Sequence, residues 1–360
     1  MDDLERDVAE QLRTLLVADP PPAGLAERIL TRTAARRRRR RAVAAAGAFV
    51  VCGAVVVGVA GARNGSDPAP AAVAVAPPSA VTIQRGLAGG QRFKAMALGS
   101  DGTVLGTSVS VGSDGASEPR GGVWTAGPSV VVPRRVQSTG AGSLPYLWTM
   151  AVGDRVQVWP EGERLKCLGP NGVVRTIGDG WSGRDRFYTE RGLVVWGRVG
   201  GRGVAVASGC DGPTRTILVK GLLKGFSYPL AFVSDGVKTW QVDVRSGAKS
   251  AVPRAPRSPD EIAAGPNAIA WVVGDDLTIR DRATGAERSV RLPAYESSSN
   301  QVSVGAHVVV YSGDDEDGDG GRARVYDVRT GSYADERGPA LAAGGWLLVQ
   351  AGDVYKLSRR

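Results

Sequence analysis

The chain has 360 residues and a formal net charge of +9, with 50 glycines, three cysteines and a single histidine. That histidine, His307, lies in the apolar run 302–311, so a serine or cysteine hydrolase would have to use it as its base. No Gly-x-Ser-x-Gly elbow, HExxH pair, phosphate loop or dinucleotide fingerprint is present. We therefore expect His307 to be a strand residue with a structural hydrogen bond, and no catalytic residue is assigned.

The N-terminus predicts an amphipathic helix. Five aliphatic residues recur there at spacings of three and four: Leu4, Val8, Leu12, Leu15 and Leu16. Asp2 and Asp3 precede them and suit the positive end of a helix dipole, and the sequence DPPP at 19–22 ends the helix. A helix of about four turns is marginal in water on its own. It therefore needs a partner, the membrane surface or a second copy of itself.

Residues 42–62 predict one membrane-spanning helix. The segment contains no charged residue, and a bilayer core requires about 20 predominantly apolar helical residues. Six arginines at 36–41 precede it, so the positive-inside rule places residues 1–41 in the cytoplasm and the C-terminal part outside the cell. A cleaved secretory signal is one alternative, because Ala60-Gly61-Ala62 fits a cleavage pattern, and a buried helix of a soluble protein is the other.

The excess of positive charge also raises the question of nucleic-acid binding. Residues 1–41 contain ten arginines and seven acidic residues, so much of the local excess is the run at 36–41. Such a juxtamembrane run ordinarily orients the helix and contacts anionic lipid. The charge distribution therefore predicts a membrane contact and no nucleic-acid partner.

A linker at 63–79 separates the membrane helix from a larger domain. Its sequence DPAPAAVAVAPPS at 67–79 favours an extended, semi-rigid spacer. Beyond it, residues 80–360 contain short β-branched runs divided by Gly, Asp, Asn and Pro turns. We therefore expect an all-β domain outside the membrane.

Internal repetition is the strongest signal in residues 80–360. Segments that predict strand, tight turn and strand recur at intervals of roughly 35–46 residues: 123–133, 165–178, 204–218, 239–253, 277–293 and 323–339. The clearest copies place Gly247, Gly285 and Gly331 where a positive φ is needed to reverse the chain. A period near forty with four short strands per unit is typical of a β-propeller.

The number of blades follows from the apolar runs that we interpret as leading strands. There are seven: 93–99, 147–153, 188–197, 228–236, 263–274, 302–313 and 340–352. The last unit stops after 353–357, short of its outermost strand, whereas 81–85 is an orphan strand at the start of the domain. Pairing the two would close the ring and remove exposed sheet edges. We therefore predict seven blades.

The repeat layout resembles the broad propeller superfamily that includes TolB-like, YVTN-type and WD-type repeats, although no Gly-His and Trp-Asp signature recurs. The first sixty residues resemble actinobacterial membrane proteins of the anti-sigma type in their arrangement: Leu-striped helix, proline break, basic run and membrane helix. That resemblance implies a sigma factor or other cytoplasmic regulator as partner. The segment lacks the zinc-ligating residues of the zinc-containing anti-sigma domain, so a tail without a specific partner stays open.

Two candidate sites stand out from the repeats. Asp315, Asp317 and Asp319 form the opening half of a calcium loop, but Ala323 and Tyr326 stand where further oxygen ligands are expected. A calcium site and a plain acidic hairpin loop both fit.

Cys167 and Cys210 are the only cysteines of the outer domain and fall in neighbouring predicted blades, so a disulfide and two free buried thiols both fit. Trp196, Trp271 and Trp346 fall in comparable strands, which favours core packing over a ligand-stacking ring.

The function we predict is that of a membrane-anchored, extracytoplasmic binding or sensor protein whose propeller face captures a protein, peptide or glycan. Two alternatives stay open. In one, the N-terminal helix binds a transcription regulator; in the other, the propeller is a hydrolase or lyase with paired carboxylates in its channel. Calcium is the one cofactor for which there is a candidate site.

Overall fold

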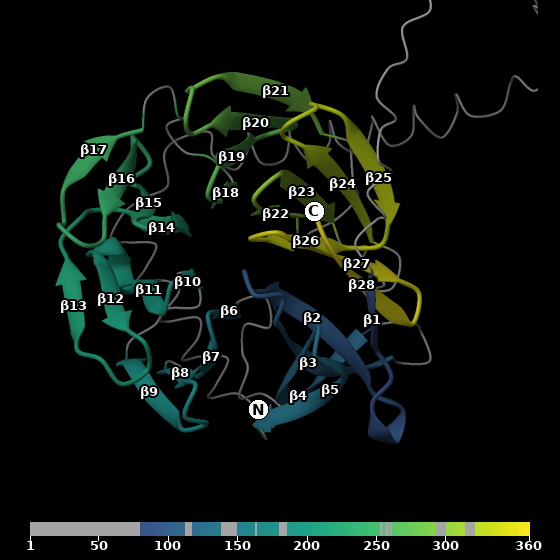
Figure 1. Cartoon of the computed structure of the whole chain (residues 1–360). Coiled ribbons are helices and arrows are strands. Elements are labelled where there is room, and N and C mark those ends of the chain that lie inside the picture. Colours follow the sequence, from purple (N-terminus) through teal and green to yellow (C-terminus); the bar gives the residue numbers. More distant parts are fainter. Residues whose placement is uncertain are drawn as a thin grey trace, which may run out of the picture. The chain divides into compact units, whose positions relative to one another are not determined.

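Seven four-stranded antiparallel sheets are arranged around a central channel as a β-propeller (Figure 1). The computed structural model describes residues 80–111, 117–137, 150–162, 164–179, 186–252, 255, 259, 261–292, 300–313 and 321–360. The predicted cytoplasmic helix, membrane helix and linker lie outside these residues, as do Asp315, Asp317 and Asp319. Among the described residues, no helix is long and apolar enough to cross a membrane.

Each blade is a meander of four strands, and every blade except the last uses consecutive strands. The blades are numbered 1 to 7 in chain order, from β2–β5 as blade 1 to β26–β28 with β1 as blade 7. The innermost strands are β2 (Arg92–Leu98), β6 (Ala151–Gly153), β10 (Phe187–Glu190), β14 (Leu222–Ser227), β18 (Glu261–Ala264), β22 (Asn300–Val304) and β26 (Ala340–Ala343). The second strands are β3 (Val104–Val111), β7 (Val156–Glu161), β11 (Leu193–Gly197), β15 (Leu230–Ser234), β19 (Ala268–Val273), β23 (Val308–Gly313) and β27 (Trp346–Ala351).

The third strands are β4 (Ser117–Gly127), β8 (Arg164–Leu168), β12 (Val204–Ser208), β16 (Thr239–Asp243), β20 (Asp276–Asp281), β24 (Arg322–Asp327) and β28 (Val354–Arg359). The outermost strands are β5 (Val130–Gln137), β9 (Val174–Asp179), β13 (Thr214–Ile217), β17 (Lys249–Ala251), β21 (Glu287–Arg291), β25 (Tyr333–Arg337) and β1 (Val81–Gln84). Two short 3-10 turns, η1 (Ala88–Gly90) and η2 (Val199–Gly201), complete the described elements.

Burial falls from the middle of each blade to its outer edge. All six residues of β23 are buried, whereas all three of β17 are exposed. A second strand packs against neighbouring blades on both faces, so it is a continuous apolar run, while an outermost strand faces water. This gradient explains why the second strands dominate the apolar pattern of the sequence.

Four of the seven runs interpreted as single leading strands are in fact hairpins. The runs 188–197, 263–274, 302–313 and 340–352 each contain an innermost strand, a tight turn and a second strand. The run 228–236 holds only the second strand β15, and the innermost strand of that blade is β14. The single-strand interpretation was wrong because the innermost strands are short and face the channel, so their pattern merges with that of the next strand.

The six repeated segments are confirmed as the hairpins between third and outermost strands. In the clearest three, an aspartate side chain closes the turn. Asp327 Oδ1 accepts the backbone N–H of Arg329 at 2.8 Å, and the N–H of Gly331 donates to the Asp327 carbonyl at 2.8 Å. The side-chain hydrogen bond from Arg329 holds the pKa of Asp327 at about 2. Asp243 and Asp281 accept the same backbone hydrogen bonds in blades 4 and 5.

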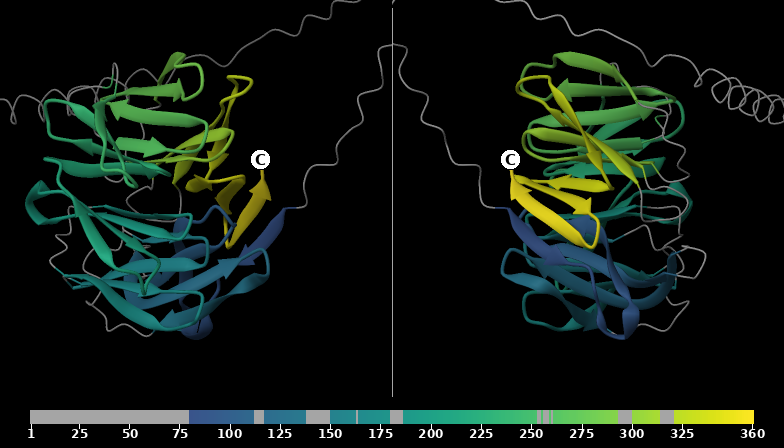
Figure 2. Two further views of the ribbon diagram at one scale, coloured as in Figure 1. Left: turned by 60° about the vertical axis from the view of Figure 1, so that its left-hand side comes forward. Right: turned by 90° about the vertical axis from the view of Figure 1, so that its right-hand side faces the viewer.

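The ring closes through the two ends of the described chain. β1 pairs antiparallel with β28, with Val81 opposite Leu357 and Gln84 opposite Val354, so blade 7 has the order β1-β28-β27-β26. In the side views, the yellow C-terminal strands adjoin the dark blue start of the domain (Figure 2). The seven-bladed architecture and its closure by the orphan strand are thus confirmed.

The three tryptophans with comparable positions all lie on second strands. Trp196, Trp271 and Trp346 are at most 9% exposed and belong to the apolar clusters within and between blades. Their predicted core role is confirmed.

His307 does not lie in a strand as we expected. It occupies the turn between β22 and β23, where its carbonyl oxygen accepts the N–H of Val328 at 2.8 Å. The prediction failed because a tight turn interrupts the apolar run that surrounds it.

Candidate functional site

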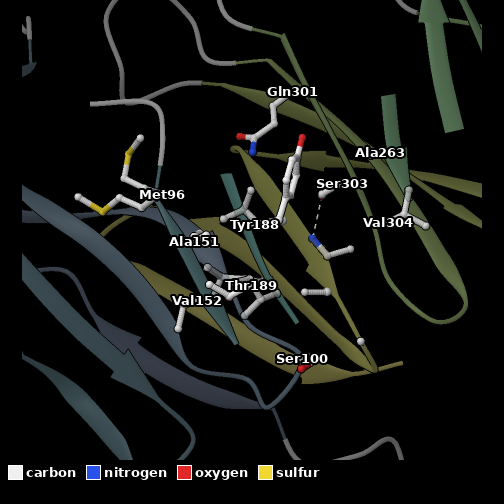
Figure 3. Close-up of a pocket in the computed structure, with 18 of the residues that line it drawn as sticks. Met96, Ser100, Ala151, Val152, Tyr188, Thr189, Ala263, Gln301, Ser303 and Val304 are labelled. Carbon is white, nitrogen blue, oxygen red and sulfur yellow. Dashed lines mark hydrogen bonds between the residues drawn. The ribbon is translucent and has the colours of Figure 1, made fainter. Parts of the chain in front are cut away.

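The central channel contains a cavity of about 800 Å³ whose wall is formed by the innermost strands of all seven blades (Figure 3). Because every blade is a four-stranded meander, the innermost strands all run in the same direction along the channel. The cavity therefore has two distinct ends. We call them the strand-start mouth, where these strands begin, and the strand-end mouth, where they turn into the second strands.

Hydrogen bonds between blades connect the strand-end mouth from blade 2 to blade 7. They are Arg191 N–H to Asp154 Oδ2, Tyr228 N–H to Glu190 Oε2 (2.8 Å), Arg282 Nη1 to Ser227 Oγ (3.0 Å), Asn267 Nδ2 to the Ala306 carbonyl (2.9 Å) and Ala306 N–H to the Gly344 carbonyl. Each joins one blade to the next. This end of the channel is therefore braced by backbone and side-chain contacts.

Glu190 is a carboxylate at the strand-end mouth whose pKa is raised. Burial raises its pKa, and the nearby Asp154 carboxylate raises it further, against the opposing effect of the Tyr228 N–H and two arginines. Two acidic groups could suggest a hydrolase or lyase site. Both accept backbone N–H groups of the next blade, however, so the hydrogen bonds that the structure shows give them a bracing role.

The strand-start mouth has a polar wall on blades 3 to 5. Arg186, which precedes β10, forms an ion pair with Glu261 at the start of β18. Between these blades, the Tyr188 hydroxyl donates to the Lys224 carbonyl at 2.6 Å. Gln301 of blade 6 continues this wall.

The electrostatics of the polar wall keep Arg186 charged and Tyr188 neutral. Burial raises the pKa of Tyr188 to about 12. Burial alone would lower the pKa of Arg186, but the charge of the Glu261 carboxylate and the hydrogen bonds to Glu261 and Tyr188 outweigh it, so the pKa of Arg186 rises. Neither side chain therefore changes its protonation state near neutral pH.

The other wall of this mouth is apolar and contains two methionines. Met96 and Met150 line the cavity from blades 1 and 2, and they pack in one cluster with Leu105, Val123 and Trp159. Figure 3 shows Met96 on one side of the cavity and Tyr188 and Gln301 on the other. The protein has three methionines, and both that follow Met1 lie at this site. The strand-start mouth thus presents soft apolar groups and fixed polar groups across one opening.

The sequence-predicted site residues lie elsewhere. Cys167 and Cys210 form a disulfide with a Cα–Cα distance of 5.5 Å, which joins β8 of blade 2 to the turn after β12 of blade 3 and is not part of the cavity wall. His307 does not line the cavity either. Within the described part of the chain, no group of three or more His, Cys, Asp or Glu residues could hold a metal ion.

The channel residues were missed at the sequence level. The one available signal was their position, since Met150, Arg186 and Glu261 immediately precede or open innermost strands. Position alone does not distinguish a channel-lining residue from an ordinary loop residue.

Comparison with known proteins supports the fold. No protein-family model matches the chain, and no curated protein matches it. Among solved structures, one from the mitotic checkpoint complex has a TM-score of 0.51 at 12% identity and covers 83% of this chain and 99% of its own. Streptogramin B lyase has a TM-score of 0.50 at 12% identity, covering 78% and 98%. BamB from Moraxella catarrhalis has a TM-score of 0.43 at 12% identity, covering 79% and 99%. The likeness to the first two shows a shared propeller fold.

Proposed function

We propose that the propeller is the ligand-binding domain of a membrane-anchored, extracytoplasmic binding protein, and that its protein, peptide or glycan ligand enters the strand-start mouth. The observation that supports this most is the cavity of about 800 Å³ with an apolar wall at Met96 and Met150 and a polar wall at Arg186, Tyr188 and Glu261. Ligand sites typically have this volume and combine apolar lining with a few fixed polar groups. A similar fold occurs in a solved structure of the mitotic checkpoint complex, which supports the choice of a protein as ligand.

The difference between the two mouths favours entry at the strand-start side. The strand-end mouth is braced by the contacts among Asp154, Glu190, Tyr228 and their neighbours. At the strand-start side, the chain passes from an outermost strand to the next innermost strand, for example from Ile217 at the end of β13 to Leu222 at the start of β14. Connections of this kind commonly carry binding residues on a rigid scaffold.

Two features support the proposed location. Disulfides persist in oxidising compartments, so the Cys167–Cys210 bond favours a propeller outside the cytoplasm. In this proposal the apolar segment 42–62 is the anchor and the arginines at 36–41 fix its orientation. The sensor version adds a cytoplasmic regulator that binds the predicted helix; deletion of residues 2–18 should then change transcription and leave ligand capture unchanged.

Filling the channel tests the binding proposal. Ala263 lines the cavity on β18, so Ala263→Trp should occupy the space that a ligand needs. Ala251→Trp, on the exposed outermost strand β17, is the matched control. Immobilised full chain in detergent is incubated with envelope extract, and retained species are quantified by mass spectrometry. We expect certain species to be retained by both the wild type and Ala251→Trp. The retained amount of these species should be at least tenfold lower with Ala263→Trp.

Two results would count against the proposal. One is equal retention by Ala263→Trp and the wild type, because ligand binding would then not involve the channel. The other is that the wild type retains nothing above background. Circular dichroism of each variant shows whether the propeller has folded.

A further inference from the structure

The apolar wall of the strand-start mouth is suited to aliphatic side chains. Methionine is unbranched and polarisable, so a methionine surface adapts to aliphatic groups of different shapes. Met96 and Met150 are each 8% exposed and are held from behind by Leu105, Val123 and Trp159. Their exposed edges therefore form a supported apolar surface at the cavity.

The polar wall is suited to a carboxylate. A guanidinium has five N–H donors in a planar fork, more than one carboxylate oxygen can use. Arg186 Nη2 contacts Glu261 Oε1, and this ion pair fixes the guanidinium at the mouth. The charged residues lining this mouth in the described structure are Lys94, Arg186 and Glu261, so their formal charge is one positive. An incoming anionic group is therefore favoured over a cationic one.

Further polar groups on the wall match a peptide backbone better than an alkyl chain. Gln301 and Ser303 lie on the facing strand β22 (Figure 3), where the Ser303 hydroxyl accepts the N–H of Ala342 at 2.9 Å. A peptide amide can hydrogen-bond with Gln301, whereas a hydrocarbon chain would leave its side-chain amide unpaired at a cost.

From these observations we propose that the strand-start mouth binds a peptide segment of a partner protein in which an aliphatic side chain lies next to a carboxylate. The aliphatic side chain packs against Met96 and Met150, and the carboxylate, from an acidic residue or a C-terminus, binds Arg186 and Lys94. This inference rests on the proposed binding function and specifies the chemical class of its ligand.

A peptide selection tests the ligand class. The immobilised full chain in detergent is used to select from a synthetic library of random octapeptides with free C-termini, and enriched peptides are resynthesised for affinity measurement. We expect enrichment of Leu, Ile, Val or Met beside Asp, Glu or the C-terminus. Arg186→Gln should weaken these peptides by about tenfold or more, because a charge-assisted hydrogen bond is lost. Met96→Gln, which makes the apolar wall polar, should weaken them to a similar extent.

Matched variants separate binding from folding. Arg215→Gln removes an exposed arginine on the outermost strand β13 and should leave the affinity unchanged. Because Arg186→Gln leaves Glu261 without its ion-pair partner, the double variant Arg186→Gln/Glu261→Gln is measured as well. It removes both charges together, and it should bind as weakly as the single variant while unfolding near the wild-type temperature.

The outcomes that would overturn the inference are distinct from failure of the proposed function. One such outcome is that Ala263→Trp blocks the selected peptides but Arg186→Gln does not weaken them. Another is that the selected peptides are basic or aromatic. Either result would reject the ligand class and leave the proposal of channel binding in place. Absence of any enriched peptide would reject it too. Laurate, a fatty acid with an alkyl chain and a carboxylate, is the probe for a lipid ligand. If laurate binds the mouth and no peptide consensus emerges, the site binds a lipid and the peptide assignment is wrong.

Discussion

Glu190 shows how a single side chain connects the channel to the stability of the ring. Its carboxylate accepts the N–H of Tyr228 across the boundary between blades 3 and 4, and burial raises its pKa. A carboxyl group with a raised pKa ionises more easily in the unfolded chain than in the folded one. The folded state therefore loses stability as the pH rises from the pKa of Glu190 in the unfolded chain to its higher pKa in the folded chain. Above that higher pKa the loss is complete.

Glu190→Gln should therefore stabilise the protein at neutral pH. The amide oxygen can still accept the Tyr228 N–H, but the side chain no longer ionises. We expect a higher unfolding temperature than that of the wild type at pH 7, with a difference that shrinks as the pH falls toward 4. Thermal unfolding followed by circular dichroism at several pH values measures this. Glu336→Gln, on the outermost strand β25, is the control and should show no such convergence. A constant difference for Glu190→Gln would contradict the explanation.

Residue-level features were predictable where they are local in sequence. Gly247, Gly285 and Gly331 were identified because each recurs in a short turn pattern, and all three adopt φ values between 72° and 76°. The Arg186–Glu261 ion pair could not be found this way, because 75 positions separate its partners and only the curvature of the ring brings them together. The aspartates that cap the turns were present in the repeats, but their role emerged only from the hydrogen bonds.

At the scale of elements, the disulfide is a bond between blades. It joins the third strand of blade 2 to the end of the third strand of blade 3, 43 positions along the chain. The pairing stayed open at the sequence level, because the two cysteines have different offsets from the turns that follow them. In the structure Cys167 lies within β8 whereas Cys210 lies in the turn after β12, which accounts for the different offsets.

Removal of the disulfide should destabilise the propeller by about 2–4 kcal/mol, as expected for a crosslink that closes a loop of this size. The variant is Cys167→Ala/Cys210→Ala, and the measurement is the free energy of unfolding in urea. A reductant should lower the stability of the wild type to that of the variant and leave the variant unchanged. If the wild type unfolds identically with and without reductant, the bond does not contribute as the structure indicates.

Strands differed in how readily they could be predicted. The second strands are buried on both faces, and their apolar runs are visible in the sequence, as in β19 and β23. The innermost strand β14 was missed because Lys224 and Gly225 interrupt its apolar residues.

At the scale of the whole molecule, the ring depends on one short strand from the start of the domain. Ile83 of β1 is fully buried in the cluster that joins blades 7 and 1. The closure could be predicted because the last repeat unit lacks a strand and the first repeat is preceded by one. The hydrogen bonds that brace the strand-end mouth could not be predicted, since they involve turn residues of six blades that share no sequence pattern.

Two truncations test the closure. Deletion of residues 1–79 retains β1, whereas deletion of residues 1–86 removes it and exposes the edge of β28. We expect the longer deletion to lower the free energy of unfolding by at least the contribution of the buried Ile83 side chain, about 1.5–3 kcal/mol. We also expect this protein to aggregate through the open edge. Thermal unfolding and light scattering compare the two proteins. Equal stability and solubility would show that the ring does not need β1.

The position of β1 also has a mechanical consequence. Any tension transmitted along the residues before Val81 reaches the ring at its own closure, through the four pairs from Val81–Leu357 to Gln84–Val354. A pull along the strand must shear these pairs together, whereas a pull across it can peel them apart one at a time, beginning at Val81. The direction of the force would thus decide whether the propeller stays a closed ring. A force along β1 is resisted by all four pairs together, and a force across β1 is resisted by one pair at a time.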